Sequence, residues 1–192
     1  MTETNKEVVR FEARIHTPSA SFPTAKTFDC FDSAANFVLT LYQNEKGRAT
    51  DAGMKRMQDS ISISKKVYKD YDAFKTGRPM SEHLIWSGMD KNLPSLVTMR
   101  KIFQMEEERA LTKGTLFVSG DGGQDSLRKF LIIKDITETD IKAELHYNAT
   151  KNTKLYPRES FLKLFHKGDG LAVWQYEKEK AYYSARQTVN SR

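Results

Sequence analysis

The sequence predicts a single α+β domain over residues 1–192, helix-rich in its first half, with an antiparallel meander sheet and flanking helices in its second half. Apolar residues recur every three or four positions through much of residues 33–111, which is a helical period. From Thr115 they recur at alternate or adjacent positions, which indicates strands. Three such runs follow one another closely, and this spacing favours antiparallel pairing. If the chain instead holds two units, we expect the boundary near residues 77–94.

The first element is predicted to be a half-buried strand over residues 8–16. Its apolar residues Val9, Phe11, Ala13 and Ile15 alternate with charged ones. Residues 17–31 contain two prolines and several hydroxyl residues, so they are predicted to be a loop. A helix over residues 33–47 should follow, with Asp32 or Ser33 as its cap and Gly47 at its end.

A long helix is predicted over residues 50–77. Apolar residues recur at helical spacing from Met54 to Phe74, Thr50 is suited to the cap, and Gly77 is suited to the end. The β-branched stretch around Ile61–Ser64 makes a kink or break there possible. The opposite face of this helix would carry a stripe of lysines.

Residues 79–94 are irregular in pattern, with a short helix expected over 81–86. Pro94 suits the first position of a helix that runs to Leu111. The acidic residues Glu106, Glu107 and Glu108 lie at its C-terminal end, which the helix dipole disfavours. This predicts either a salt-bridge partner or a functional surface, although an ordinary solvated helix end explains it equally well.

The second half is predicted to contain strands over 115–120, 128–136 and 141–150. A helix follows over 157–168, then a strand over 170–177, a helix over 177–187 and a frayed end.

The segment Gly120–Gly123 reads GDGG and lies between two of these strands. It lacks the third glycine of a dinucleotide-binding loop and the lysine of a Walker loop. The residues after it suggest a strand, whereas a phosphate-binding loop opens a helix, and Asp121 and Asp125 would repel phosphate. We therefore interpret it as a hairpin turn. A metal site using the two aspartates is the sharper alternative, with too few ligands to stand alone.

The formal net charge is +6, and it is unevenly distributed. Residues 46–78 and 151–192 each carry nine Lys/Arg against four Asp/Glu, whereas 1–45 and 79–150 are each net −2. The single cysteine, Cys30, excludes an internal disulfide, and the charged N-terminus and short apolar runs predict a cytoplasmic protein without a membrane segment.

The two basic blocks contain segments 65–78 and 173–186, in which cations alternate with aromatic residues. Such a mixture suits nucleic acid, because cations neutralise phosphates and aromatic rings stack on bases. The leading hypothesis is a small non-enzymatic nucleic-acid-binding protein with a lysine-rich helical face. The predicted phosphate contacts are Lys55, Arg56, Lys65, Lys66, Lys69, Lys75 and Arg78, and the predicted stacking residues are Tyr68 and Tyr182 or Tyr183. Solvated lysines and a buried aromatic face explain the same pattern.

Two other classes stay open. One is a protein-interaction module, such as an inhibitor, adaptor or assembly factor of a virus or mobile element. The other is an enzyme whose site is assembled from distant residues, with candidates His146, His166, Asp169, Asp121 and Asp125. No local zinc motif or nucleophile motif is present, so we expect no metal, no cofactor and no catalytic residue that the sequence can name.

Overall fold

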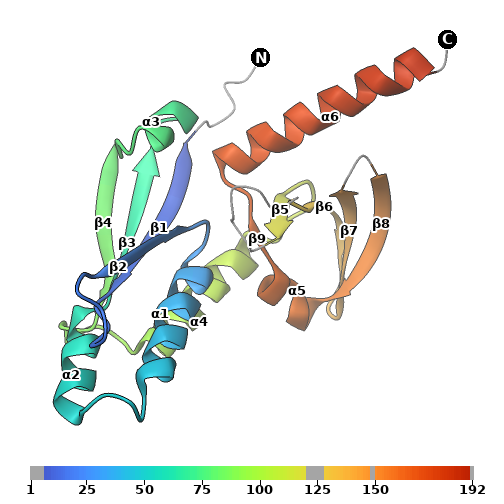
Figure 1. The fold of residues 1–192 in the computed structure, drawn as a ribbon. Helices are drawn as coiled ribbons and strands as arrows, with labels where there is room; N and C mark the ends of the chain where they lie inside the picture. Colours follow the sequence, from blue (N-terminus) through green and yellow to red (C-terminus); the bar gives the residue numbers. More distant parts are fainter. Residues whose placement is uncertain (1–6, 120–127, 148–149, 191–192) are drawn as a thin grey trace. The chain divides into compact units, whose positions relative to one another are not determined.

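The structure, a computed structural model, describes residues 7–119, 128–147 and 150–190 (Figure 1). It confirms a mixed α+β fold with two sheets. The chain divides into two compact units. The four-stranded unit comprises Val9–Tyr68 and Gly77–Met105, and the five-stranded unit comprises Met1–Val8, Lys69–Thr76 and Glu106–Arg192, in so far as these are described.

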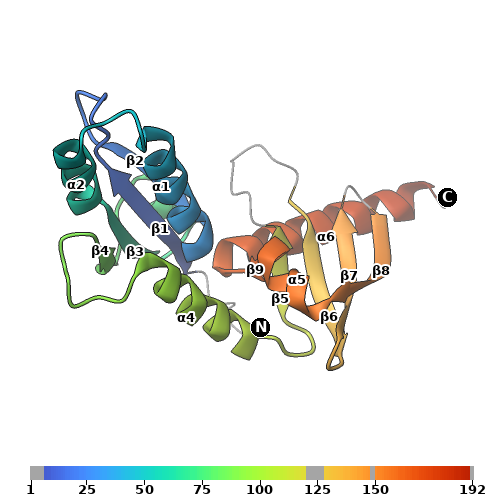
Figure 2. The ribbon, with the colours of Figure 1, turned by 90° about the horizontal axis from the view of Figure 1, so that it is seen from below.

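The four-stranded sheet has the order β2-β1-β3-β4. Its strands are β1 (Val8–Ile15), β2 (Thr24–Phe28), β3 (Ser62–Tyr68) and β4 (Ser81–Ser87). Three helices cover one face of this sheet (Figure 2): α1 (Phe31–Glu45), α2 (Asp51–Ser60) and α4 (Leu96–Arg109), whose last residues belong to the five-stranded unit.

The core of this unit lies between the sheet and those helices. Phe11 of β1 meets Phe31 and Phe103 edge-on, with ring centroids 6.1 and 5.8 Å apart, and the last two rings stack at 4.2 Å. Ala13 and Ile15 are fully buried on the same strand face, as their alternation predicts. The opposite face of the sheet carries charged residues, described below.

The prediction of one continuous helix over residues 50–77 is wrong, but the chain does leave the helix at the β-branched stretch where a break was expected. Thr50 does cap α2, accepting a hydrogen bond from Gly53 N at 3.2 Å, but the helix ends at Ser60. The Ser60 hydroxyl donates to Met57 O at 2.6 Å and accepts from His16 N at 2.8 Å. Ile61 and Ile63 are then both buried, so a period of two replaces the helical one and β3 begins.

Two further parts of this unit differ from their prediction. The loop expected over 17–31 contains β2, which pairs with β1 in antiparallel register. The short helix expected over 81–86 is instead β4, in which Trp86 pairs with Ile63 of β3. Trp86 is buried and donates from Nε1 to Pro94 O at 2.9 Å, so packing of this large side chain decides the local structure. The helix predicted at 33–47 is confirmed as α1, capped by Cys30 rather than by Asp32 or Ser33.

The five-stranded sheet has the order β8-β7-β6-β5-β9. Its strands β5, β6 and β7 form the predicted antiparallel meander, and β8, which was not predicted, extends it. Its elements are α3 (Tyr71–Lys75), β5 (Leu116–Ser119), β6 (Phe130–Ile136), β7 (Asp140–Tyr147), β8 (Thr150–Pro157), α5 (Arg158–Leu164), β9 (Phe165–Lys167) and α6 (Gly170–Asn190). The segment Gly120–Gly123, like Asp121 and Asp125, lies outside the described residues. The segment after it is a strand, as predicted.

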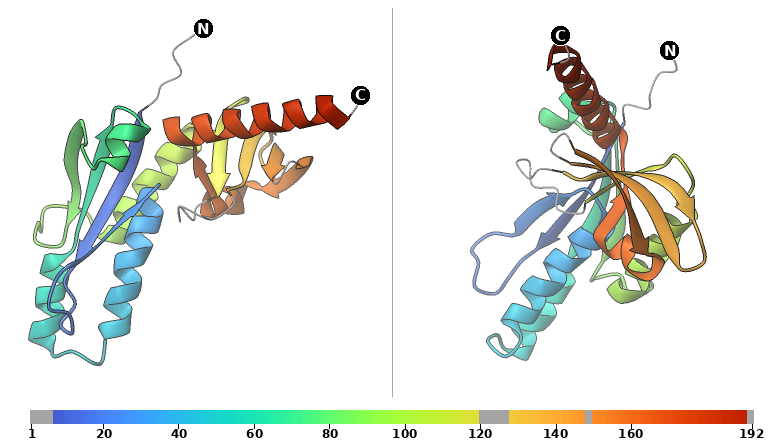
Figure 3. Two further views of the ribbon diagram at one scale, coloured as in Figure 1. Left: turned by 45° about the horizontal axis from the view of Figure 1, so that its top comes forward. Right: turned by 90° about the vertical axis from the view of Figure 1, so that its right-hand side faces the viewer.

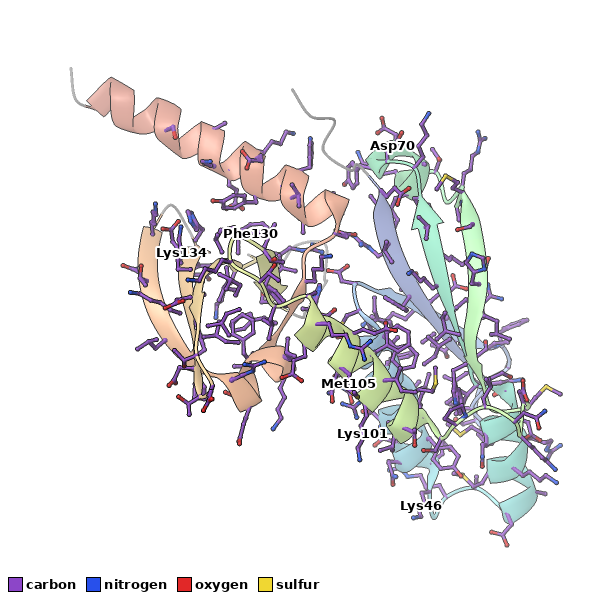
Figure 4. All side chains as sticks on the ribbon, turned by 180° about the vertical axis from the view of Figure 1, so that it is seen from behind. Lys46, Asp70, Lys101, Met105, Phe130 and Lys134 are labelled. Atoms are coloured by element: carbon purple, nitrogen blue, oxygen red, sulfur yellow. The ribbon has the colours of Figure 1, made fainter. Side chains whose placement is uncertain are left out.

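Helices lie on both faces of this sheet (Figure 3). On one face, Phe117 packs against Phe161 of α5 at 5.2 Å between ring centroids. On the other face, α6 places Ala172 and Tyr176 against Phe130, which Figure 4 labels on β6.

The strand predicted over 170–177 is wrong, because these residues form the first turns of α6. The Asp169 carboxylate accepts a hydrogen bond from Ala172 N at 3.0 Å, and Gly170 N donates to Glu7 O at 3.0 Å. Leu171 and Ala172 are buried next to one another, which resembles a short apolar strand in sequence. The helix predicted at 157–168 is confirmed but ends at Leu164, and β9 follows it.

Candidate nucleic-acid interface

The two aromatic and basic segments singled out in the sequence meet within the five-stranded unit. Tyr71 of α3 stacks on Trp174 of α6, with ring centroids 5.7 Å apart and an interplanar angle of 26°. Lys75 Nζ lies 4.6 Å from the Tyr71 ring centroid, and Lys178 Nζ lies 4.1 Å from that of Trp174. We call these four residues the aromatic–lysine cluster.

Short local contacts form α3. The Asp70 carboxylate, labelled in Figure 4, accepts a hydrogen bond from Ala73 N at 2.8 Å and caps the helix. Thr76 N donates to Asp72 O at the other end, and Gly77 takes a positive φ of 66° just after the helix. Tyr71 therefore lies in the first turn of a capped helix, in a fixed position opposite Trp174.

The helical spacing of α6 separates two faces. Ala172, Val173 and Tyr176 pack on the sheet. Trp174, Lys178 and Tyr182 recur every four residues and therefore lie along another side of the helix. Trp174 is 45% exposed and Tyr182 is 53% exposed, so this side of the helix has aromatic surface in contact with solvent.

The charge around the cluster is mixed. Lys69, Lys75 and Lys178 are exposed, but so are Asp72 and Glu177. Recognition at this surface would therefore rest on ring stacking with a few charge contacts, since the local excess of positive charge is small.

Lys65 and Lys66 lie on β3 of the four-stranded unit, so they share no helix face with the cluster. The Lys66 ammonium is 2.8 Å from Glu12 Oε2 and 3.7 Å from Glu82 Oε2, and its side chain is only 13% exposed. Burial alone would lower the pKa of Lys66, but the hydrogen bond and charge of Glu12 raise it overall. Glu12 also binds Arg14 at 2.6 Å. The charge of Lys66 is thus already neutralised within the protein.

The structure gives no support to the prediction that Tyr68 stacks on a base. Tyr68 is only 5% exposed, because it lies at the end of β3 with its ring covered. Burial also raises the pKa of its phenol.

The remaining predicted contacts are dispersed. Lys55 and Arg56 are exposed on α2, and Arg78 is exposed before β4. A single lysine-rich helical face is therefore wrong, because the long helix on which it depended is three separate elements. The side chain of Tyr183 lies outside the described residues.

Sequence reasoning missed Tyr71, Trp174 and Lys178. Tyr71 has the spacing of a core residue in the incorrect long helix. The signal for the other two was present as the four-residue recurrence of Trp174, Lys178 and Tyr182. It was hidden because residues 170–177 were predicted to be a strand.

Of the residues proposed for an enzyme, the structure describes His146, His166 and Asp169, and the two histidines lie on separate strands. His146 is on β7 and His166 is on β9, and β6 and β5 lie between these strands, a spacing of roughly 14 Å. Asp169 caps α6. His146 Nε2 lies 2.7 Å from Glu144 Oε1. Burial opposes ionisation of Glu144, but hydrogen bonds from His146 and two lysines lower its pKa to about 2.

Three wider findings bear on function. Within residues 7–119, 128–147 and 150–190, no group of three or more His, Cys, Asp or Glu is placed to hold a metal ion. None of the helices in the described chain combines the length and the apolar character needed to span a bilayer. No protein-family model, curated protein or solved structure matches the chain.

Proposed function

We propose that this chain is a non-enzymatic nucleic-acid-binding protein that binds single-stranded DNA or RNA at the aromatic–lysine cluster. The observation that carries the proposal is the stack of Tyr71 on exposed Trp174, with Lys75 and Lys178 over the rings. Two segments far apart in sequence, each rich in aromatics and cations, contribute to it.

Single strands suit this surface because their bases are free to stack. A base on an aromatic side chain contributes about 1–3 kcal/mol, and it does so with little regard to sequence. On binding, Lys75 and Lys178 would leave the rings for phosphate oxygens, which exchanges a cation–π contact for an ion pair. A duplex keeps its bases stacked inside and offers only the phosphates.

Fluorescence polarisation with labelled single- and double-stranded DNA and RNA tests this proposal. We expect tighter binding of single strands, and an affinity loss of about 10-fold in Trp174→Ala. Leu155→Ala is the control, because Leu155 is an exposed apolar residue on β8 outside the cluster. Equal binding of duplex and single strand, or equal affinity of the wild type and Trp174→Ala, would contradict the proposal.

The protein-interaction module is a second candidate, favoured by apolar side chains exposed on α4. Val97, Ile102 and Met105 are all exposed on this helix, and Figure 4 labels Met105. Ile102→Glu with Met105→Glu should abolish recovery of a stoichiometric partner protein while nucleic-acid affinity stays unchanged. If the double variant recovers the same partner in the same amount, α4 is not the binding surface.

A further inference from the structure

The four-stranded unit contains a hollow at the junction of β1 and α2. Its volume is ≈ 230 Å³, and it is lined by His16, Thr17, Pro18, Gly53, Arg56 and Met57. These residues come from the chain just after β1 and from the first two turns of α2. The aromatic–lysine cluster belongs to the other unit, so the hollow is a separate feature of the protein.

Hydrogen bonds hold both walls of the hollow. His16 N donates to the Ser60 hydroxyl at 2.8 Å, which connects the residue after β1 to the end of α2. His16 Nε2 lies 3.0 Å from Ala20 O, which fixes the imidazole ring. Thr50 caps α2 at Gly53 N. The walls are therefore formed by the fold before any ligand binds.

The absence of a side chain at Gly53 keeps this junction close. A Cβ built there would lie 3.3 Å from Thr50 Oγ1 and 3.7 Å from Pro18 Cγ. A side chain at position 53 would therefore crowd the capping hydroxyl of Thr50 and come into van der Waals contact with Pro18. Met57, which is only 1% exposed, supplies an apolar wall beside it.

The polar lining of the hollow is suited to a negative charge. The polar and charged residues in it are Arg56, His16 and Thr17, and no acidic residue lines it. Among the described residues, the Arg56 side chain makes one hydrogen bond, from Nε to Ala52 O at 3.4 Å, and no ion pair. Its two terminal nitrogens can therefore bind an oxyanion in the paired geometry that guanidinium favours.

We infer that this hollow binds a small organic anion, with its phosphate or carboxylate group at Arg56 and a compact apolar body against Met57 and Pro18. The volume is below the roughly 300–1,000 Å³ of pockets for drug-sized ligands, so the body is no larger than a single ring. This inference goes beyond the proposed function and does not depend on it. It gives Arg56 a role separate from nucleic-acid binding.

Calorimetric titration of the full chain with phenyl phosphate, benzoate, inorganic phosphate and benzyl alcohol tests the inference. We expect one site for phenyl phosphate or benzoate, weaker binding of inorganic phosphate, and no binding of the neutral alcohol. Whichever of the two aromatic anions binds more tightly identifies the preferred oxyanion. Absence of binding by both at about 10 mM, or equal binding of the alcohol, would overturn the inference.

The neighbouring pair Arg56 and Lys55 provides matched variants. Both residues are exposed on α2, but only Arg56 lines the hollow. Arg56→Gln should weaken the aromatic anion at least 10-fold, whereas Lys55→Gln, with the same change in charge, should leave its affinity unchanged. Equal losses in the two variants would indicate general attraction to the surface and overturn the site. Single-strand affinity should be the same in both variants, which separates this test from that of the proposed function.

Discussion

On the four-stranded sheet, Lys66 lies between the carboxylates of Glu12 and Glu82, whereas in the five-stranded unit Lys75 and Lys178 lie over the rings of Tyr71 and Trp174. A lysine between two carboxylates has its charge compensated inside the protein. A lysine over an aromatic ring keeps a full charge and makes a weaker contact, of about 0.5–1 kcal/mol at an exposed site. Lysines of the same basic block, residues 46–78, therefore differ in their availability to an external phosphate.

The largest effect is expected at Arg10 and Asp29 of the four-stranded unit, an ion pair whose charges are compensated inside the protein as that of Lys66 is. Arg10 Nε lies 3.2 Å from Asp29 Oδ1, and the two side chains are 4% and 6% exposed. Asp29→Ala should lower the free energy of unfolding by about 3 kcal/mol or more, because it leaves a buried guanidinium without this partner. Urea denaturation measures this loss. Asp135→Ala, which breaks the exposed pair with Lys113, is the control and should have no measurable effect.

The five-stranded unit also contains a group with compensated charge, Glu144, and its ion pairs should make the stability of the protein depend on pH. The folded pKa of Glu144 is about 2, below its usual 4.5, so its contribution is fully present above about pH 5.5 and is lost as the pH falls toward 2. We expect that loss to be about 2 kcal/mol, since solvent screens part of the interaction. Glu144→Gln should remove this part of the pH dependence in urea denaturation measured from pH 7 to pH 3. An unchanged slope in the variant would show that other carboxylates are responsible.

The smallest effect is expected in the salt dependence of single-strand binding, compared between variants of the cluster lysines and variants of the lysines on β3. Lys75→Gln with Lys178→Gln should reduce the salt slope of single-strand binding by about 1.4, since each phosphate contact contributes about 0.7. Lys65→Gln with Lys66→Gln changes the net charge by the same amount and should leave the slope unchanged. Polarisation titrations across a range of salt concentrations measure both slopes. Equal reductions would mean that overall charge, and not the cluster, determines binding.

The sequence correctly predicts those helices and strands in which the apolar residues of one buried face recur at a single clear period. The alternation in β1 was predicted correctly from Phe11 to Ile15, although Arg10 on the predicted polar face is buried, and the meander from β5 to β7 was predicted because its apolar runs follow one another closely. Prediction from the sequence fails where the apolar residues fit both the helical period and the period of a strand. Residues 50–77 match a helical spacing, but the burial of Ile61 and Ile63 against the sheet decides for a strand, and only tertiary packing supplies that information.

At the acidic end of α4, the sequence predicted one part of the structure and left another part open. Its misfit with the helix dipole predicted either a partner or a functional surface, and partners are present. Glu108 pairs with Arg158 at 3.2 Å, and Glu107 accepts a hydrogen bond from Lys167 N at 2.7 Å. The composition of the candidate interface was likewise predictable, because segments 65–78 and 173–186 were identified. The stack of Tyr71 on Trp174 was not, since no local pattern specifies which distant rings meet.

The assignment of Lys69–Thr76 to the five-stranded unit has a consequence for dissection of this protein. These residues lie in sequence between β3 and β4 of the other unit, so no single cut in the chain yields two complete halves. A fragment that stops at Met105 keeps all four strands of the first sheet but deprives Tyr71 of Trp174. The dependence runs in one direction: loss of residues 1–105 would also remove Lys69–Thr76 from the five-stranded unit, whereas loss of residues 106–192 would leave the four-stranded unit complete.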